Sequence, residues 1–177
     1  MFVIIGASCA GKSSIERELT KHGLNRIISY TSRSIRKNET EDIDYHYISD
    51  QEFNEKLNQG FFVEHSIYNS WNYGVASKDC YDNSICVVET SGMRQLKNNK
   101  NLNVKSFYID VDERTRVVRM MNRGDNIMES FRRIISDQGM FSGIKDEVDY
   151  VIPNPDGKLN EAVNQILDII RREGREK

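Results

Sequence analysis

The sequence FVIIGASCAGKS, residues 2–13, decides the fold. Its first four residues are apolar and typical of a buried strand, and the loop after them carries two glycines before Lys12 and Ser13. In this order of strand, loop and helix, backbone N–H groups surround phosphate oxygens and the helix N-terminus faces the same oxygens. Lys12 adds a charge that reaches the β- and γ-phosphates, and Ser13 offers a hydroxyl to magnesium. The stretch predicts a P-loop that binds a nucleoside triphosphate.

The composition predicts one compact domain that acts on small anions. The chain has 177 residues, of which 38% are hydrophobic and 29% charged, and this length is enough for a substantial core. A net charge of -2 gives no overall basic field, so polymeric nucleic acid is not an expected partner. Three cysteines without metal-ligand spacing are expected to be reduced. We find no signal peptide and no apolar run near the roughly 20 residues of a membrane span, so we expect a cytoplasmic protein, monomeric or homodimeric.

Short strands alternate with helical segments along much of the chain. Further strands are predicted at 26–29, 84–89, 105–111 and 149–152. Helices are predicted at 12–22 and 159–173, and a third begins at Ser49, whose side chain forms a capping box with Glu52. This alternation predicts an α/β fold with a parallel sheet and helices on both of its faces.

Two stretches interrupt this pattern. Between residues 29 and 84 the sequence becomes polar, rich in tyrosine and alternating, which predicts a small mixed insert. It opens with Arg33 and Arg36 next to hydroxyl residues, and two guanidinium groups at this spacing can converge on one phosphate, although a solvated basic loop would look the same. The second stretch, 123–143, has three arginines and three glycines and predicts a mobile cover.

Together these segments resemble the guanylate kinase family over almost the whole chain. Besides the P-loop, the matching blocks are TSRSIR (31–36), ETEDIDY (39–45), FVEH (62–65), NYG (72–74), RMMNRG (119–124) and VDYVIPN (148–154). The resemblance implies a P-loop core at 1–32, 84–122 and 144–177, with a nucleoside monophosphate-binding insert at 33–83. It also implies a short helical lid at 123–143.

The resemblance implies ATP-dependent phosphorylation of GMP and dGMP, with Mg²⁺ as cofactor. The residues expected to bind ATP are Gly6, Ala7, Ser8, Cys9, Ala10, Gly11, Lys12, Ser13, Ser14 and Arg119. Those expected to bind GMP are Ser29, Arg33, Arg36, Tyr45, Glu64, Tyr73, Gly74 and Glu89. The residues expected to be catalytic are Lys12, Arg33, Arg123, Arg132 and Arg133; either of the last two can match the lid arginine of the family. Ser13 and Glu89 are expected to hold the metal.

The chemistry of guanine supports the role implied for Glu64. Guanine has adjacent N–H donors at N1 and N2, so one carboxylate accepts both, whereas adenine has no such pair. An ordinary surface carboxylate on an alternating strand is the other interpretation of this residue.

Two positions depart from the family pattern. Val87 stands where the family commonly has an aspartate two residues before Glu89, and Val75 stands where it usually has a serine or threonine that contacts guanine. Two alternatives therefore stay open: a related kinase for another nucleotide or a sugar phosphate, and a guanylate kinase-like binding module without catalysis. Such modules usually have a degraded P-loop, whereas this P-loop is intact.

Overall fold

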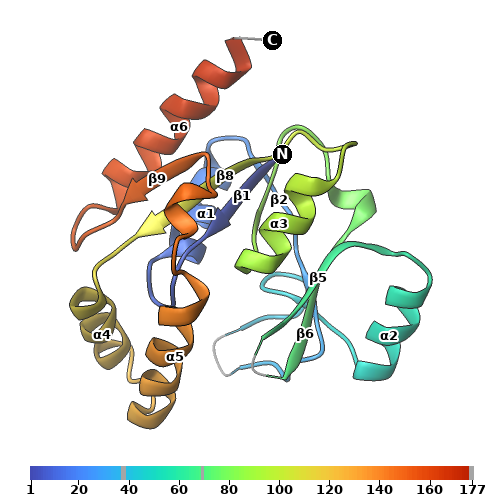
Figure 1. Ribbon diagram of the computed structural model, residues 1–177, viewed down its shortest axis with the longest axis horizontal. Helices are drawn as coiled ribbons and strands as arrows, with labels where there is room; N and C mark the ends of the chain where they lie inside the picture. The colour runs from blue at the N-terminus through green and yellow to red at the C-terminus, as the bar shows by residue number, and fades with distance from the viewer. Residues whose placement is uncertain (37–38, 69, 176–177) are drawn as a thin grey trace.

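The computed structural model describes residues 1–36, 39–68 and 70–175, and Figure 1 shows it as two sheets with helices around them. The strands are β1 (Phe2–Ile5), β2 (Asn25–Arg26), β3 (Tyr30–Thr31), β4 (His46–Tyr47), β5 (Phe62–Tyr68), β6 (Trp71–Ala76), β7 (Ser84–Val87), β8 (Lys105–Asp110) and β9 (Tyr150–Pro153). The helices are α1 (Lys12–Lys21), α2 (Asp50–Asn58), α3 (Thr90–Asn98), α4 (Glu113–Asn122), α5 (Ile127–Met140) and α6 (Leu159–Arg175), with 3₁₀ turns η1 (Ser77–Asp79) and η2 (Ile144–Asp146).

The larger sheet is parallel, and among the described residues its strands run in the order β2-β7-β1-β8-β9. Alternate residues of β1 face opposite layers. Ile4 joins a cluster with residues of α1 and α6, whereas Val3 and Ile5 join a second cluster with Met93 and Leu96 of α3. Helices therefore cover both faces of the sheet, and the predicted α/β fold is confirmed.

The predicted elements of the core are close to those observed. The helix predicted at 12–22 is α1, and Ser49 caps α2 in the expected capping box with Glu52. The strand predicted at 26–29 is shorter, because β2 ends at Arg26. At Ser29 the chain already pairs with the second sheet, since the carbonyl of Ser29 accepts a hydrogen bond from the backbone N–H of His46.

The second sheet has the strand order β4-β3-β6-β5 in the described part of the chain, and α2 packs beside it. β5 and β6 form an antiparallel hairpin with an irregular register between Phe62 and Glu64. Phe62 stacks on Phe53 of α2, whereas the Glu64 carboxylate lies against Gly92 of α3. Residues two apart on a regular strand share a face, so this bulge turns Glu64 away from α2.

The segment predicted as a cover is mostly helical. α5 runs beside α4, and Asp137 of α5 pairs with Arg116 of α4 at 2.8 Å, both side chains being buried. Every helix in the described residues is too short or too polar to cross a lipid bilayer.

Candidate active site

The P-loop joins β1 to α1 and is held closely by a distant residue. Gly11 has a φ of +96°, and a Cβ at this position would lie 2.5 Å from Nδ2 of Asn154. That amide group donates to the Ala10 carbonyl at 2.8 Å. Cys9 also adopts a left-handed conformation, with a φ of +59°. Only glycine fits at position 11, because any side chain would push Asn154 away from the loop.

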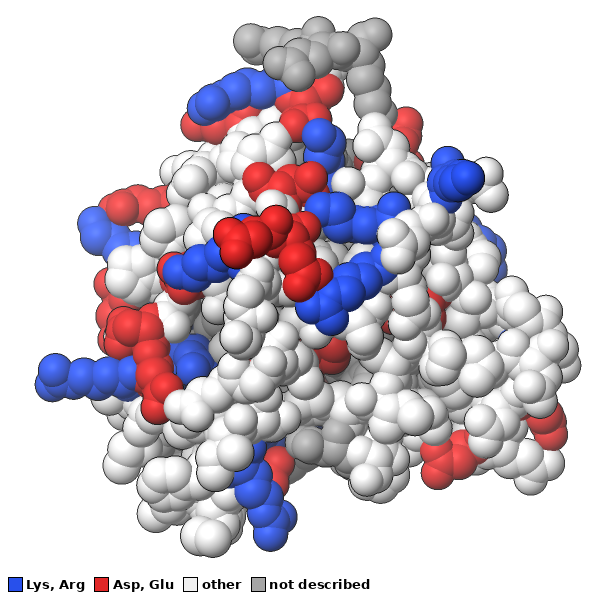
Figure 2. Space-filling model, in the orientation of Figure 1, with Lys and Arg blue, Asp and Glu red and all other residues white. Residues whose placement is uncertain are grey.

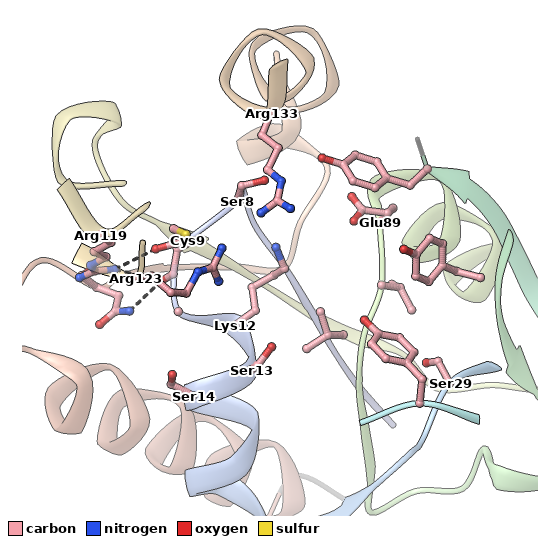
Figure 3. Close-up of a pocket in the computed structure, with 18 of the residues that line it drawn as sticks. Ser8, Cys9, Lys12, Ser13, Ser14, Ser29, Glu89, Arg119, Arg123 and Arg133 are labelled. Atoms are coloured by element: carbon pink, nitrogen blue, oxygen red, sulfur yellow. Dashed lines mark hydrogen bonds between the residues drawn. The ribbon is translucent and has the colours of Figure 1, made fainter. Parts of the chain in front are cut away.

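Lys12 turns back over its own loop. Its Nζ donates to the carbonyls of Gly6 and Ala7, the latter at 3.3 Å. The backbone N–H of Ser8 donates to the Asp137 carboxylate at 2.9 Å, so α5 contacts the loop directly. Figure 3 shows Lys12, Ser8 and Arg133 gathered around one hollow. The loop therefore has a lysine and a backbone donor available to phosphate oxygens once these internal partners are exchanged.

Arg119 of α4 anchors the other end of the loop. Its guanidinium donates to the Cys9 carbonyl at 3.2 Å and the Asn154 carbonyl at 2.9 Å, and it pairs with Asp156 at 2.9 Å. Figure 3 shows this group beside the loop, separate from Lys12. Arg119 therefore lies against the P-loop, and its role in binding ATP stays a prediction.

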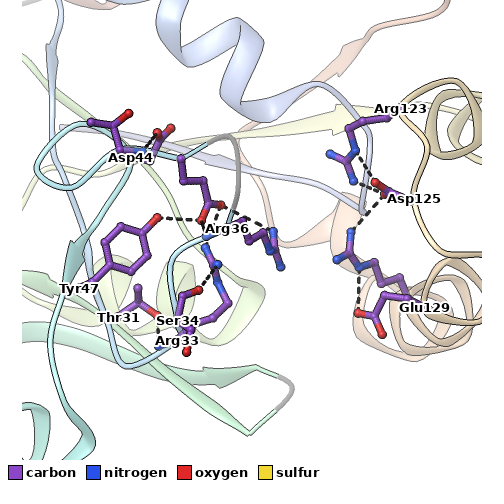
Figure 4. Close-up of polar contacts among 12 residues, drawn as sticks. Thr31, Arg33, Ser34, Arg36, Asp44, Tyr47, Arg123, Asp125 and Glu129 are labelled. Carbon is purple, nitrogen blue, oxygen red and sulfur yellow. Dashed lines mark hydrogen bonds and ion pairs between the residues drawn. The ribbon is translucent and has the colours of Figure 1, made fainter.

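The Glu39 carboxylate forms a network of hydrogen bonds with Arg33 and its neighbours (Figure 4). Glu39 accepts hydrogen bonds from the Arg33 guanidinium at 2.9 Å, the Arg36 backbone N–H at 2.9 Å and the Tyr47 hydroxyl at 2.8 Å. Burial acts to raise the pKa of Glu39, but these three donors hold it below its ordinary value. The Arg33 guanidinium also lies 5.5 Å from the Tyr45 ring centre, and its buried Nε has no partner among the described residues. An anion can therefore replace Glu39 at a guanidinium that is already oriented.

Glu64 and Glu89 face the same hollow from β5 and from the end of β7. Glu64 is only 3% exposed, and its Oε2 has no hydrogen-bond partner within the described part of the chain. Burial, with a smaller effect from the charge of Glu89, raises the pKa of Glu64 to about 8. Burial likewise raises the pKa of Glu89, against the opposing charge of Lys12. An unpaired carboxylate in a buried position is costly without a ligand that donates to it.

The lid arginines are paired with acidic neighbours. Arg123 pairs with Asp125, and Arg133 lies 3.5 Å from the same carboxylate and 3.3 Å from Glu129 (Figure 4). Arg132 does not line this hollow. Its side chain is 78% exposed, and its guanidinium lies 4.0 Å from the Glu129 carboxylate. Arg123 and Arg133 are therefore the lid arginines nearest the P-loop hollow.

The hollow is a cavity of about 480 Å³ lined by the P-loop, the β5–β6 hairpin and residues of α4 and α5. The predicted site residues that line it are Ser8, Cys9, Ala10, Gly11, Lys12, Ser13, Ser14, Ser29, Arg33, Arg36, Tyr45, Glu64, Tyr73, Glu89, Arg119, Arg123 and Arg133. Gly6 and Ala7 lie at the start of the loop, and Gly74 packs against Phe62 and Phe53 on the α2 side of the hairpin. Arg132 lines a neighbouring hollow, beside Arg33, Arg36 and Trp71.

Several residues at the site were not among those predicted from the sequence, and four of them have polar side chains. Ser66, Tyr68 and Asn154 line the cavity, and Asp137 contacts the P-loop. Strand alternation places Ser66 on the face of Glu64, so the sequence alone could have identified Ser66 as a site residue. No local pattern points to Asp137, because its partner Ser8 is 129 residues away. On the face shown in Figure 2, acidic and basic side chains are intermixed.

Comparisons with known proteins agree with this arrangement. The family model described as guanylate kinase matches residues 1–173. Guanylate kinases of Rickettsia bellii and Rickettsia prowazekii are 29% and 30% identical; the alignments cover 98% and 96% of this chain and 94% and 89% of those proteins. The crystal structure of guanylate kinase from Anaplasma phagocytophilum is similar in fold, with a TM-score of 0.76 and 23% identity over 98% of this chain and 85% of that one.

Proposed function

The chain belongs to the guanylate kinase family, which phosphorylates GMP with ATP, and on this premise we propose how its cavity performs the transfer. ATP binds at the P-loop end, and GMP or dGMP binds between β3, β5 and β6. The γ-phosphoryl group then passes in line from one nucleotide to the other. Phosphoryl transfer needs little proton chemistry from the protein, so positioning and charge stabilisation carry the catalysis.

The donor end consists of the P-loop with Lys12 and Arg119. The α1 N-terminus and the loop N–H groups face the triphosphate, and Lys12 exchanges its loop carbonyls for phosphate oxygens. Ser13 and Glu89 supply hydroxyl and carboxylate oxygens to the same cavity, the donor type that Mg²⁺ prefers. When bound, the ion would neutralise charge on the phosphates, with Ser13 and Glu89 as its protein ligands.

The acceptor end separates phosphate recognition from base recognition. Arg33 and Arg36, with the hydroxyls of Tyr45 and Tyr73, bind the monophosphate, and Glu39 releases Arg33 as it does so. Glu64 accepts the N1 and N2 donors of guanine. The buried Oε2 of Glu64, unpaired among the described residues and open to the P-loop cavity, is the observation that carries this assignment.

The lid completes the site. We propose three moving parts with the bounds 1–32, 84–122 and 144–177 for the core, 33–83 for the insert and 123–143 for the lid. Arg123 and Arg133 share Asp125 in this structure, and we propose that they transfer to the reacting phosphates as the lid closes. Closure also excludes water, which would otherwise hydrolyse ATP.

A coupled assay of ADP release tests the proposal. Rates are measured with ATP and Mg²⁺ against GMP, dGMP, AMP, CMP, UMP and no acceptor. We expect turnover with GMP and dGMP only, reduced about a hundredfold or more in Lys12→Ala, because it loses a charge that stabilises the transition state. Lys145→Ala is the matched control, since Lys145 is an exposed lysine paired with Asp110 outside the cavity.

The assay also separates the alternatives. Turnover with another phosphorylated acceptor, but not with GMP, would contradict the base assignment of Glu64. ATP binding without turnover on any acceptor would contradict the catalytic assignment and favour a binding module.

A further inference from the structure

The Glu64 carboxylate can form hydrogen bonds with only part of the guanine edge. A carboxylate accepts from N1 and N2, but O6, the next group on the same edge, is an acceptor and needs a donor. An acceptor that loses water on entering a closed cavity and gains no partner is costly. A base site built around Glu64 therefore needs a hydroxyl or N–H group beside that carboxylate.

The β5–β6 hairpin places Glu64, Ser66 and Tyr68 on one face, together with their partners Val75, Tyr73 and Trp71. Glu64 pairs with Val75, and Ser66 pairs with Tyr73 in the strand register. Val75 is fully buried in the apolar cluster that includes Val88 and Met93, and a valine side chain has no donor. Ser66, by contrast, lines the cavity together with Glu64 and Tyr73.

The Ser66 hydroxyl is nearly buried and is free to form a hydrogen bond with a ligand in the cavity. The residue is only 6% exposed, and within the described part of the chain its hydroxyl makes no hydrogen bond. Two residues along a strand separate Glu64 from Ser66 by about 6.6 Å, and both side chains project to the same side. This spacing allows the carboxylate and the hydroxyl to contact neighbouring positions of one base edge.

We propose that Ser66 donates its hydroxyl proton to O6 of guanine and so takes part in base recognition beside Glu64. The inference rests on the proposed GMP site. Ser29, from the segment that leads into β3, is a second serine that lines this part of the cavity, and the test must distinguish the two.

The experiment compares kcat/KM for GMP, IMP and 6-thio-GMP in wild type, Ser66→Ala, Ser66→Thr and Ser29→Ala. Sulfur at position 6 is a weak acceptor, whereas IMP keeps O6 and lacks the 2-amino group that Glu64 reads. In wild type we expect about three- to tenfold lower kcat/KM for 6-thio-GMP than for GMP, as for one hydrogen bond. In Ser66→Ala we expect kcat/KM for GMP to fall by about the same factor and the preference for GMP over 6-thio-GMP to disappear.

Two controls make the result specific. Ser66→Ala should leave the ratio of GMP to IMP and the KM for ATP unchanged, and Ser66→Thr, which keeps the hydroxyl, should keep the preference for GMP. Thermal unfolding checks that each variant is folded, and Ser66→Cys replaces Ser66→Ala if the latter is not.

The proposal is overturned if Ser66→Ala retains the preference for GMP over 6-thio-GMP, if wild type has no such preference, or if Ser29→Ala alone abolishes it. Each of these results leaves GMP phosphorylation intact. Absence of GMP turnover in wild type would instead contradict the proposed function.

Discussion

Replacing Glu64 with glutamine should stabilise the nucleotide-free protein, and increasingly so as the pH rises. Burial, and then the charge of Glu89, raises the pKa of Glu64 from 4.5 to about 8 on folding. Between these values the unfolded chain releases the proton that the folded chain keeps, so stability falls with rising pH. At about 1.4 kcal/mol per pH unit, the cost is about 3 kcal/mol at pH 7 and approaches about 5 kcal/mol above pH 8. Glutamine keeps the side-chain size and has no such titration.

The assay is urea unfolding of wild type and Glu64→Gln at pH 5.5, 7.0 and 8.5. The stability advantage of the variant should grow by about 3 kcal/mol across this range, equivalent to about 6–12 °C in Tm for a domain of this size. Glu16, whose pKa is also raised, to about 7, by burial, is present in both proteins, so the comparison cancels its contribution. An advantage that stays constant with pH would refute the assignment of a buried, unpaired carboxyl at position 64.

Three further outcomes are expected. Gly92→Ala should raise the KM for GMP about tenfold or more at saturating ATP, because the new Cβ would lie 2.3 Å from Oε2 of Glu64. The KM for ATP should stay unchanged. Equal changes in both constants, measured from initial rates, would contradict this. Asp137→Ala should lower the unfolding free energy by about 3–5 kcal/mol in urea titrations, because it leaves Arg116 buried without its partner and removes the acceptor of the Ser8 N–H; a loss below 1 kcal/mol would count against it. GMP affinity, by calorimetry, should rise with pH up to about 8, since only the ionised Glu64 accepts both guanine donors, and a flat profile in this range would exclude that carboxylate.

The sequence predicted those parts of the molecule whose signals are local. The P-loop lies between an apolar strand and a helix, so its place at the carboxyl end of β1 followed from residues 2–22 alone. The capping box at Ser49 is equally local. The strand at 26–29 was too long because its apolar residues also serve the crossing to the second sheet, where Ser29 meets His46.

Contacts between distant segments were not predictable. Asn154 reaches the P-loop from beyond β9, 144 residues from its partner Ala10, and nothing in its neighbourhood indicates that destination. The choice between Arg132 and Arg133 depended on which face of α5 turns inward, and only the packing of that helix decides it.

The bulge in β5 divides the hairpin into two parts whose side chains face different surroundings. Before it, Phe62 belongs to the aromatic packing against α2; after it, Glu64 and Ser66 face the cavity in which we propose that the nucleotide binds. Substitutions on the nucleotide side can therefore alter which base is accepted without loosening the packing of α2. A strand of the same length without the bulge would couple the two again, since residues two apart on a regular strand share a face and Glu64 would turn to the side of Phe62. Changes of acceptor preference among proteins with this hairpin are thus expected to accumulate after the bulge, whereas changes of stability accumulate before it.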